Sequence, residues 1–128
     1  MKLVAGGAWQ GKREWVKAQE KKNLTFADGK TDDYEKAKKA DVILGFHQYV
    51  RRMTEDGQSE EEILSFADSV VKENPHVIIT MDEVGYGIVP MDALERRYRE
   101  NAGRTGQLLA SMADEVYRVV AGIGQRIK

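Results

Sequence analysis

The sequence predicts one α/β domain over residues 1–128, with a mainly parallel sheet flanked by helices. Short apolar segments alternate with stretches of helical periodicity, which is the order that parallel strands with crossover helices require. A glycine-rich turn, V-A-G-G-A-W-Q-G-K-R at residues 4–13, joins the first apolar segment to the first helical stretch. A length of 128 residues, of which 41% are hydrophobic and 32% charged, suits a single domain with a modest core.

The first half of the chain is expected to alternate three strands with three helical segments. Apolar runs such as D-V-I-L-G-F at residues 41–46 are typical of strands that are buried on both faces. Trp15, Val16 and Gln19 recur at helical spacing after the glycine-rich turn. The expected strands cover residues 2–5, 24–27 and 41–46, and the expected helices cover residues 12–20, 33–39 and 47–54.

The second half is expected to hold two longer helices and two more strands. Ser59, followed by Glu62 three residues later, forms a capping box, which marks a helix start. That helix should end before Pro75, because the residue that precedes a proline disfavours helical backbone. A strand over residues 76–81, a long helix over 92–114 and a last strand over 115–121 complete the plan.

The glycine-rich turn has the pattern of a phosphate-binding loop. Gly6, Gly11 and Lys12 fit GxxxxGK, while Arg13 stands where the pattern continues with serine or threonine. Glycines let backbone N–H groups converge on phosphate oxygens, and the next helix start and the lysine add positive charge. A guanidinium has no acceptor for Mg²⁺, so the need for Mg²⁺ stays open and no protein metal ligand is assigned. The candidate phosphate-binding residues are Gly6, Gly7, Ala8, Gly11, Lys12 and Arg13.

Composition excludes several kinds of partner. The net charge of −1 gives no general attraction to nucleic acid or to acidic membrane surfaces, so an anion site must be local. The absence of cysteine excludes disulfides and thiolate metal sites. The apolar runs are too short to span a bilayer and no signal peptide is recognisable, which makes the cytoplasm the expected location.

Ligands of parallel sheets bind beyond the carboxyl ends of the strands, so the residues that follow each strand are candidates for a site. The simplest interpretations are a polar strand end for Asp28 and a capping or packing residue for His47. Asp82 and Glu83 are candidate catalytic residues together with Lys12, since carboxylates near a phosphate loop hold Mg²⁺ or accept a proton from an attacking hydroxyl. Alternatively, both carboxylates cap a turn that leads into the glycines at positions 85 and 87.

The second half also carries a long pattern of mixed chemistry. It reads T-M-D-E-V-G-Y-G-I-V-P at residues 80–90 and L-E-R-R-Y-R-E-N-A-G-R-T-G-Q-L-L-A-S-M-A-D-E-V-Y-R-V-V-A-G-I at residues 94–123. Together with the glycine-rich turn, this pattern resembles the adenosylcobinamide kinase / adenosylcobinamide-phosphate guanylyltransferase family of cobalamin biosynthesis. The resemblance implies a P-loop NTPase fold of the RecA type that uses GTP or ATP, assembled as a homo-oligomer and often as a trimer.

The resemblance also implies two reactions, phosphorylation of the adenosylcobinamide hydroxyl and transfer of GMP to that phosphate through a guanylylated histidine. The chain departs from the family pattern at several places. The histidine segment between the second and third strands is absent, and the Glu expected after the third strand is replaced by Gly45-Phe46. Arg13 replaces the loop hydroxyl, and Asp82 and Gly106 each replace an Asn.

Two interpretations of these departures follow. As an enzyme, the chain would use Arg13 to contact the nucleotide phosphates and to neutralise part of the charge that Mg²⁺ otherwise neutralises. Asp82 and Glu83 would then recruit metal or act as base. Kinase activity would then persist while guanylyl transfer is lost. As a binding protein, the chain would hold a nucleotide or corrinoid without turnover, as a regulatory or partner subunit. Formation of phosphorylated corrinoid that is lost in Lys12→Ala would favour the enzyme.

Overall fold

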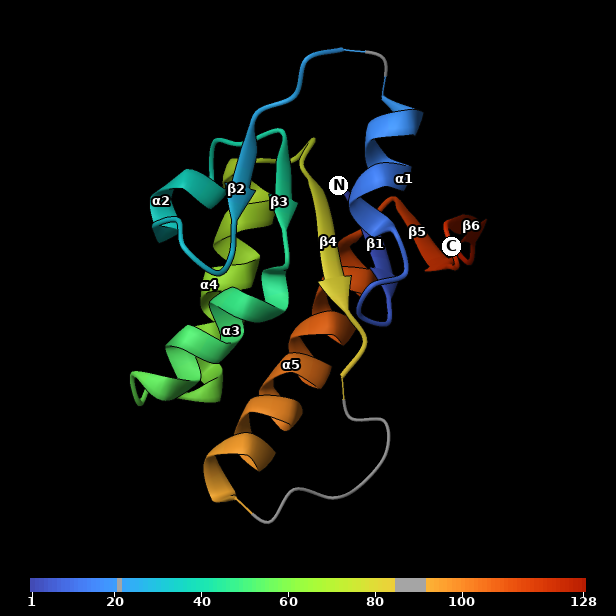
Figure 1. The fold of residues 1–128 in the computed structure, drawn as a ribbon. Helices are drawn as coiled ribbons and strands as arrows, with labels where there is room; N and C mark the ends of the chain where they lie inside the picture. The colour runs from blue at the N-terminus through green and yellow to red at the C-terminus, as the bar shows by residue number, and fades with distance from the viewer. Residues whose placement is uncertain (21, 85–91) are drawn as a thin grey trace.

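The computed structural model describes residues 1–20, 22–84 and 92–128 (Figure 1). Within these ranges, the strands form one six-stranded sheet in the order β2–β3–β4–β1–β5–β6. β6 runs antiparallel to β5, and the other neighbouring pairs are parallel. The prediction of a mainly parallel sheet flanked by helices is confirmed.

Each expected strand and helix is present, with its ends shifted by at most two residues. The predicted capping box of Ser59 and Glu62 is also present. β6 was not predicted, because its sequence I-G-Q-R has no apolar alternation and the strand forms by pairing with β5. The strands are β1 Lys2–Gly6, β2 Phe26–Asp28, β3 Val42–Leu44, β4 Ile78–Asp82, β5 Glu115–Val120 and β6 Ile123–Arg126; the helices are α1 Lys12–Gln19, α2 Tyr34–Ala37, α3 Phe46–Glu55, α4 Glu60–Glu73 and α5 Ala93–Met112.

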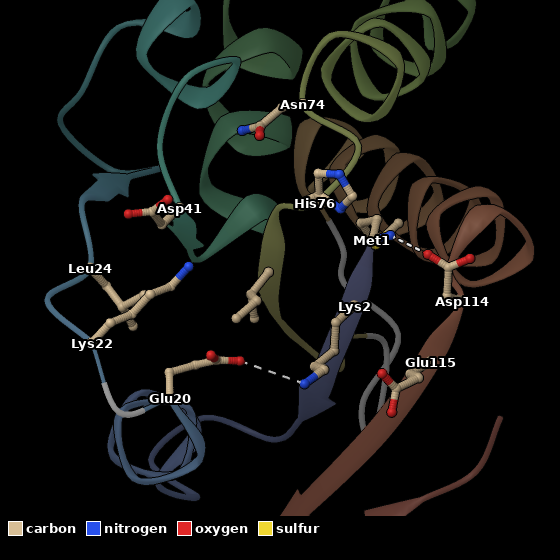
Figure 2. A pocket seen from close by; sticks show the side chains of 11 residues that line it. Met1, Lys2, Glu20, Lys22, Leu24, Asp41, Asn74, His76, Asp114 and Glu115 are labelled. Carbon is tan, nitrogen blue, oxygen red and sulfur yellow. Dashed lines mark hydrogen bonds and ion pairs between the residues drawn. The ribbon is translucent and has the colours of Figure 1, made fainter.

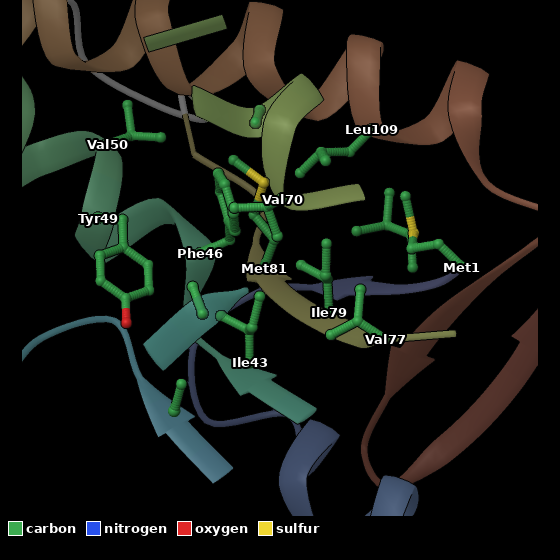
Figure 3. Close-up of a cluster of buried hydrophobic side chains, with 14 of the residues drawn as sticks. Met1, Ile43, Phe46, Tyr49, Val50, Val70, Val77, Ile79, Met81 and Leu109 are labelled. Carbon is green, nitrogen blue, oxygen red and sulfur yellow. The ribbon is translucent and has the colours of Figure 1, made fainter. Parts of the chain in front are cut away.

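Helices cover the two faces of the sheet unequally. On one face, α3, α4 and α5 enclose the larger buried cluster, where Ile43 and Ile79 of the sheet meet Phe46 and Leu109 of the helices (Figure 3). On the opposite face, α1 packs Val16 into a smaller cluster with strand residues. Because successive strand side chains point to opposite faces, the two clusters take alternate residues of the same strands. α1 and α5 therefore lie on opposite sides of β1.

A single residue, Gly45, connects β3 to α3. Its φ of 73° is left-handed, and glycine takes that conformation without the steric cost of a Cβ. The strand therefore turns directly into the helix, and α3 begins at Phe46 rather than at the expected residue 47. This turn places His47 at the carboxyl edge of the sheet.

The path of the chain creates a switch point between β1 and β4. From β1 the chain passes through α1 to β2 at one edge of the sheet, and from β4 it passes through α5 to β5 on the other side of β1. In open α/β sheets, the crevice at such a point is where ligands bind. None of the helices in the described ranges has both the length and the apolar character needed to cross a membrane.

Candidate functional site

A cleft of about 450 Å³ lies at the switch point between β1 and β4. Its walls come from the glycine-rich loop, the first turn of α1, the carboxyl ends of β2, β3 and β4, and the start of α3. The cleft brings together Lys12, His47 and Asp82, with Arg13 and Asp28 also in its walls. Most of the residues that the sequence singles out beyond the strand ends thus lie around one cavity.

Two glycines of the loop occupy places that other residues would not fit. Gly11 is the N-cap of α1 and has a left-handed φ of 88°. A Cβ on Gly6 would lie 2.5 Å from the carbonyl oxygen of Val119 in β5. The Gly6 carbonyl also accepts a hydrogen bond from the Glu83 amide at 2.8 Å. These contacts fix both ends of the loop against the sheet and the helix, while Ala8 between them is exposed.

The loop is also fastened to the turn between β5 and β6. The Ala121 amide donates to the Gln10 side-chain oxygen, and the Gly122 amide donates to the Gln10 carbonyl, both over 2.7 Å. Next to this anchor, Trp9 has a left-handed φ of 63° and a side chain that is 100% exposed. Bulky residues rarely adopt positive φ, so surrounding contacts must hold the backbone there. The Gln10 anchor supplies them.

Lys12 points back into the loop instead of into solvent. Its ammonium donates to the Gly7 carbonyl at 2.7 Å and to the Gly6 carbonyl at 3.2 Å. It also forms an ion pair with Asp82 Oδ1 at 2.7 Å, and its side chain is only 9% exposed. An ammonium group has three N–H donors, and three acceptors surround this one. A phosphate that reaches Lys12 must therefore replace one of these partners.

His47 contacts both the main chain and the side chain of Asp82. The Asp82 amide donates to His47 Nδ1 at 3.1 Å, and His47 Nε2 lies 3.3 Å from Asp82 Oδ2. Burial lowers the pKa of His47 below its usual 6.5, and the nearby Lys12 and Arg51 charges lower it further against the opposing effect of Asp82. The imidazole is therefore neutral at pH 7, with its proton on Nε2, because Nδ1 accepts the Asp82 amide.

The sequence interpretation of His47 as a capping or packing residue missed this contact. The two residues are far apart in sequence, and helix α3 alone gives no hint of a partner for the imidazole. A usable signal was present, since His47 and Asp82 both follow the carboxyl ends of neighbouring strands.

Glu83 is not brought into the cleft with Lys12. Both of its carboxylate oxygens accept from the Arg118 guanidinium of β5, at 2.9 and 3.1 Å. Consecutive residues of an extended chain point to opposite sides, so Asp82 turns toward the face of α1 and Glu83 toward the face of α5. The two carboxylates were predicted to share one site, whereas in the structure Asp82 lies in the Lys12 cleft and Glu83 pairs with Arg118. A catalytic part for Glu83 stays a prediction.

The residues that the structure describes around the cleft do not form a magnesium site of their own. Arg13 occupies the loop position where a hydroxyl would serve, and its guanidinium lies 5.8 Å from the centre of the Phe26 ring. Gly45 brings no carboxylate to the end of β3, and Asp82 is engaged with Lys12. Over the described part of the chain, no cluster of three or more His, Asp or Glu side chains is placed to hold a metal ion.

A second cavity, of about 280 Å³, lies at the opposite edge of the sheet, beside the amino ends of the strands (Figure 2). Four of its charged groups are already paired with one another. The amino group of Met1 binds Asp114, and Lys2 lies 3.7 Å from Glu20. This edge lacks the glycine-rich loop and the converging carboxyl ends of the strands, so the Lys12 cleft is the stronger candidate site.

Part of the sequence pattern lies outside the described residues. The predicted turn through Gly85 and Gly87 belongs to that part, as does the G-Y-G-I-V-P stretch at residues 85–90. Whether Asp82 and Glu83 cap such a turn is therefore not tested.

Comparison with known proteins identifies the family of this chain. A family model described as cobinamide kinase / cobinamide phosphate guanyltransferase matches residues 12–127. The chain is also similar to the bifunctional adenosylcobalamin biosynthesis protein CobU of Salmonella typhimurium and to that of Escherichia coli, with 54% and 52% identity over 52 residues. Those residues are 41% of this chain and 29% of each relative. Because the family model matches most of its length, the chain belongs to the cobinamide kinase / cobinamide phosphate guanyltransferase family.

Proposed function

We propose that the chain binds GTP or ATP through its phosphates on the loop of residues 6–13, and transfers the terminal phosphoryl group to the hydroxyl of adenosylcobinamide. The observation that carries this proposal is the placement of Lys12. Its ammonium is buried at the switch point of the sheet, at the N-terminus of α1, and is held by acceptors of the loop and by Asp82. A phosphate arriving at this helix end would find a cation and oriented N–H groups.

The cleft supplies what phosphoryl transfer needs, namely charge neutralisation and positioning. Lys12 would turn from Asp82 to a phosphate oxygen as the nucleotide binds. Arg13 lines the same cleft on the exposed first turn of α1, where its guanidinium can reach a second phosphate oxygen. The acceptor hydroxyl would approach between the transferred phosphoryl group and the Asp82 carboxylate.

Guanylyl transfer is left out of this proposal. That reaction, as the resemblance implies it, needs a histidine that is free to accept the nucleotide. Of the two histidines in the chain, His47 is buried and its Nδ1 already accepts the Asp82 amide, and His76 lines the cavity at the opposite edge of the sheet. Assembly as a homo-oligomer, with a trimer as the form to test, is proposed from the resemblance, and a cytoplasmic location is proposed from the short apolar runs of the sequence.

Nucleotide titration with a matched pair of lysine variants tests the proposal. In Lys12→Met, affinity for GTP or ATP should fall by about 100-fold, because about 3 kcal/mol of charge-assisted hydrogen bonding is lost. Lys17→Met, an exposed change on the same helix, should bind like the unchanged protein. Isothermal titration calorimetry measures both affinities, and separation of corrinoid products after incubation with adenosylcobinamide measures turnover.

The outcomes separate the two parts of the proposal. Binding without any phosphorylated corrinoid would overturn the kinase assignment and favour a regulatory or partner role. Failure of the unchanged protein to bind either nucleotide would overturn both parts.

A further inference from the structure

Trp9 places a large apolar ring in water at the candidate site. Its side chain is 100% exposed and lies in the wall of the Lys12 cleft. In the described ranges, the other large apolar side chains that are exposed lie in β5, in β6 or just after β6, namely Val120, Ile123 and Ile127. Single exposed apolar residues are ordinary on protein surfaces, but a tryptophan has a large apolar area to bury. An unburied indole beside the cleft therefore points to a ligand contact.

The backbone of the loop sets the position of this indole. Trp9 has a left-handed φ of 63°, and the next two residues are both held, Gln10 by the turn after β5 and Gly11 as the N-cap of α1. Bulky residues keep such a strained conformation only where surrounding contacts impose it, and positions of this kind cluster at ligand-binding sites. The loop thus presents the ring to solvent at the mouth of the cleft.

The other tryptophan of the chain shows what a structural role requires. The centre of the Trp15 ring lies 4.9 Å from that of Tyr117, and a Cβ on Gly124 would lie 2.2 Å from the Trp15 ring. Trp15 therefore packs α1 against β5 and β6. Because the side chain of Trp9 is fully exposed, its removal should cost the fold little.

We infer that Trp9 is a specificity-determining residue, whose indole packs flat against the conjugated macrocycle of the acceptor while the acceptor hydroxyl enters the Lys12 cleft. This inference rests on the proposed kinase function and deepens it. Flat conjugated rings pack favourably in offset face-to-face contact, and an indole offers a large rigid face for it. The contact lies away from the reacting atoms, so it serves binding of the acceptor and not the chemical step.

The place of Trp9 in the loop favours the acceptor over the nucleobase. In phosphate loops of this pattern, the lysine reaches the β- and γ-phosphates of the nucleotide, and Trp9 precedes Lys12 by three residues in the same tight turn. The base of the nucleotide lies beyond the α-phosphate and the ribose, away from these outer phosphates. The acceptor, in contrast, must meet the terminal phosphate in line with the leaving diphosphate. A side chain at this point of the loop is therefore nearer to the acceptor than to the base.

Calorimetric titrations with matched variants test this contact. In Trp9→Ala, affinity for adenosylcobinamide, measured with a non-hydrolysable GTP or ATP analogue bound, should fall about 10-fold through loss of one ring contact. Affinity for GTP and ATP should not change. Trp9→Phe keeps a flat ring and should recover most of the loss. Ile127→Ala is the control, since it removes an exposed apolar side chain whose backbone pairs with Val116 near the amino ends of the strands, and it should leave both affinities unchanged.

Steady-state kinetics should show the same division. In Trp9→Ala, the KM for adenosylcobinamide should rise about 10-fold while the nucleotide KM stays the same. The kcat should change little, because Lys12, Arg13 and Asp82 are untouched. Thermal melts should coincide for the variants and the unchanged protein, which shows that the fold is intact in each.

The outcomes distinguish the possible failures. A weaker nucleotide affinity with an unchanged acceptor affinity would place the ring against the base and overturn the inference. Equal affinities in Trp9→Ala and the unchanged protein would also refute it; a simultaneous change of oligomeric state, measured by sedimentation velocity, would then identify Trp9 as a subunit contact. If the unchanged protein binds nucleotide but not adenosylcobinamide, the proposed kinase function fails and the inference fails with it.

Discussion

Replacing Asp82 with asparagine should weaken the fold and strengthen nucleotide binding at the same time. The change keeps the shape of the side chain and removes the charge that pairs with Lys12 Nζ at 2.7 Å. Without a bound ligand, the ammonium is then left with only the carbonyls of Gly6 and Gly7. In the loaded cleft, a phosphate no longer competes with a carboxylate for Lys12.

The size of both effects follows from the same ion pair. The side chains of Lys12 and Asp82 are 9% and 24% exposed, so the pair is largely but not fully removed from water. At this distance and an effective dielectric constant of about 20, the gross attraction is roughly 6 kcal/mol, most of which desolvation offsets. With two carbonyl acceptors remaining, we expect the free energy of unfolding to fall by about 2 kcal/mol. A phosphate that no longer has to displace the Asp82 carboxylate from Lys12 gains the same 2 kcal/mol, which corresponds to roughly 30-fold tighter binding of a phosphate-bearing ligand.

Urea unfolding measures the stability, and calorimetric titration with GTP, ATP and inorganic tripolyphosphate measures the affinity. Glu83→Gln is the matched control, since its carboxylate pairs with Arg118 outside the Lys12 cleft and its loss should leave the affinity unchanged. A weaker affinity in Asp82→Asn would refute the reasoning, because it would mean that Asp82 assists the ligand instead of competing with it. Turnover should nevertheless fall in this variant, since the candidate proton acceptor is gone.

Two further predictions concern stability. Lowering the pH should destabilise the fold, because the lowered pKa of His47 keeps the folded protein from taking up a proton that the unfolded chain binds. The loss begins as the pH falls through 6.5 and continues toward the folded-state pKa with a slope of at most about 1.4 kcal/mol per pH unit. The urea concentration at the unfolding midpoint, measured between pH 7.5 and 5 for the unchanged protein and for His47→Gln, checks this prediction. An equal decline in both proteins would contradict the role of His47 in the pH dependence. Gly124→Ala should lower the free energy of unfolding by about 1–3 kcal/mol, because the added Cβ would lie 2.2 Å from the Trp15 ring. Gly103→Ala should raise it by about 0.5–1 kcal/mol, because the added Cβ in α5 would meet open space. Thermal melts measure both changes, and a shift of the same sign in the two variants would contradict the packing argument.

The order of strands and helices could be predicted from the sequence because it depends on local periodicity and caps. Apolar runs fixed β1, β3 and β4, and the capping box of Ser59 and Glu62 fixed the start of α4. β6 could not be found in this way, since a segment with a glycine and one apolar residue becomes a strand only through its pairing with β5. Tertiary contacts decide such segments.

The loop and Lys12 could also be predicted, because the pattern of glycines and a lysine is contiguous in the sequence. The contacts among Lys12, His47 and Asp82 could not, since they depend on the order of strands across the sheet. The separation of Asp82 from Glu83 could have been foreseen from the alternation of side chains along a strand. Gly45 and Asp82, where the chain departs from the family pattern, both lie next to the His47 ring.

The anchor of Gln10 on the turn of Ala121 and Gly122 has a consequence for how the site comes into being. The loop is synthesised well before its anchor, which can form only after residue 122 has been added to the chain. Strand β1 likewise has neighbours on both sides only after β4 and β5 have been synthesised. A nascent chain therefore carries the phosphate-loop sequence long before it can form the site. Nucleotide binding by such a chain would indicate that β5 and the turn after it have folded against the loop.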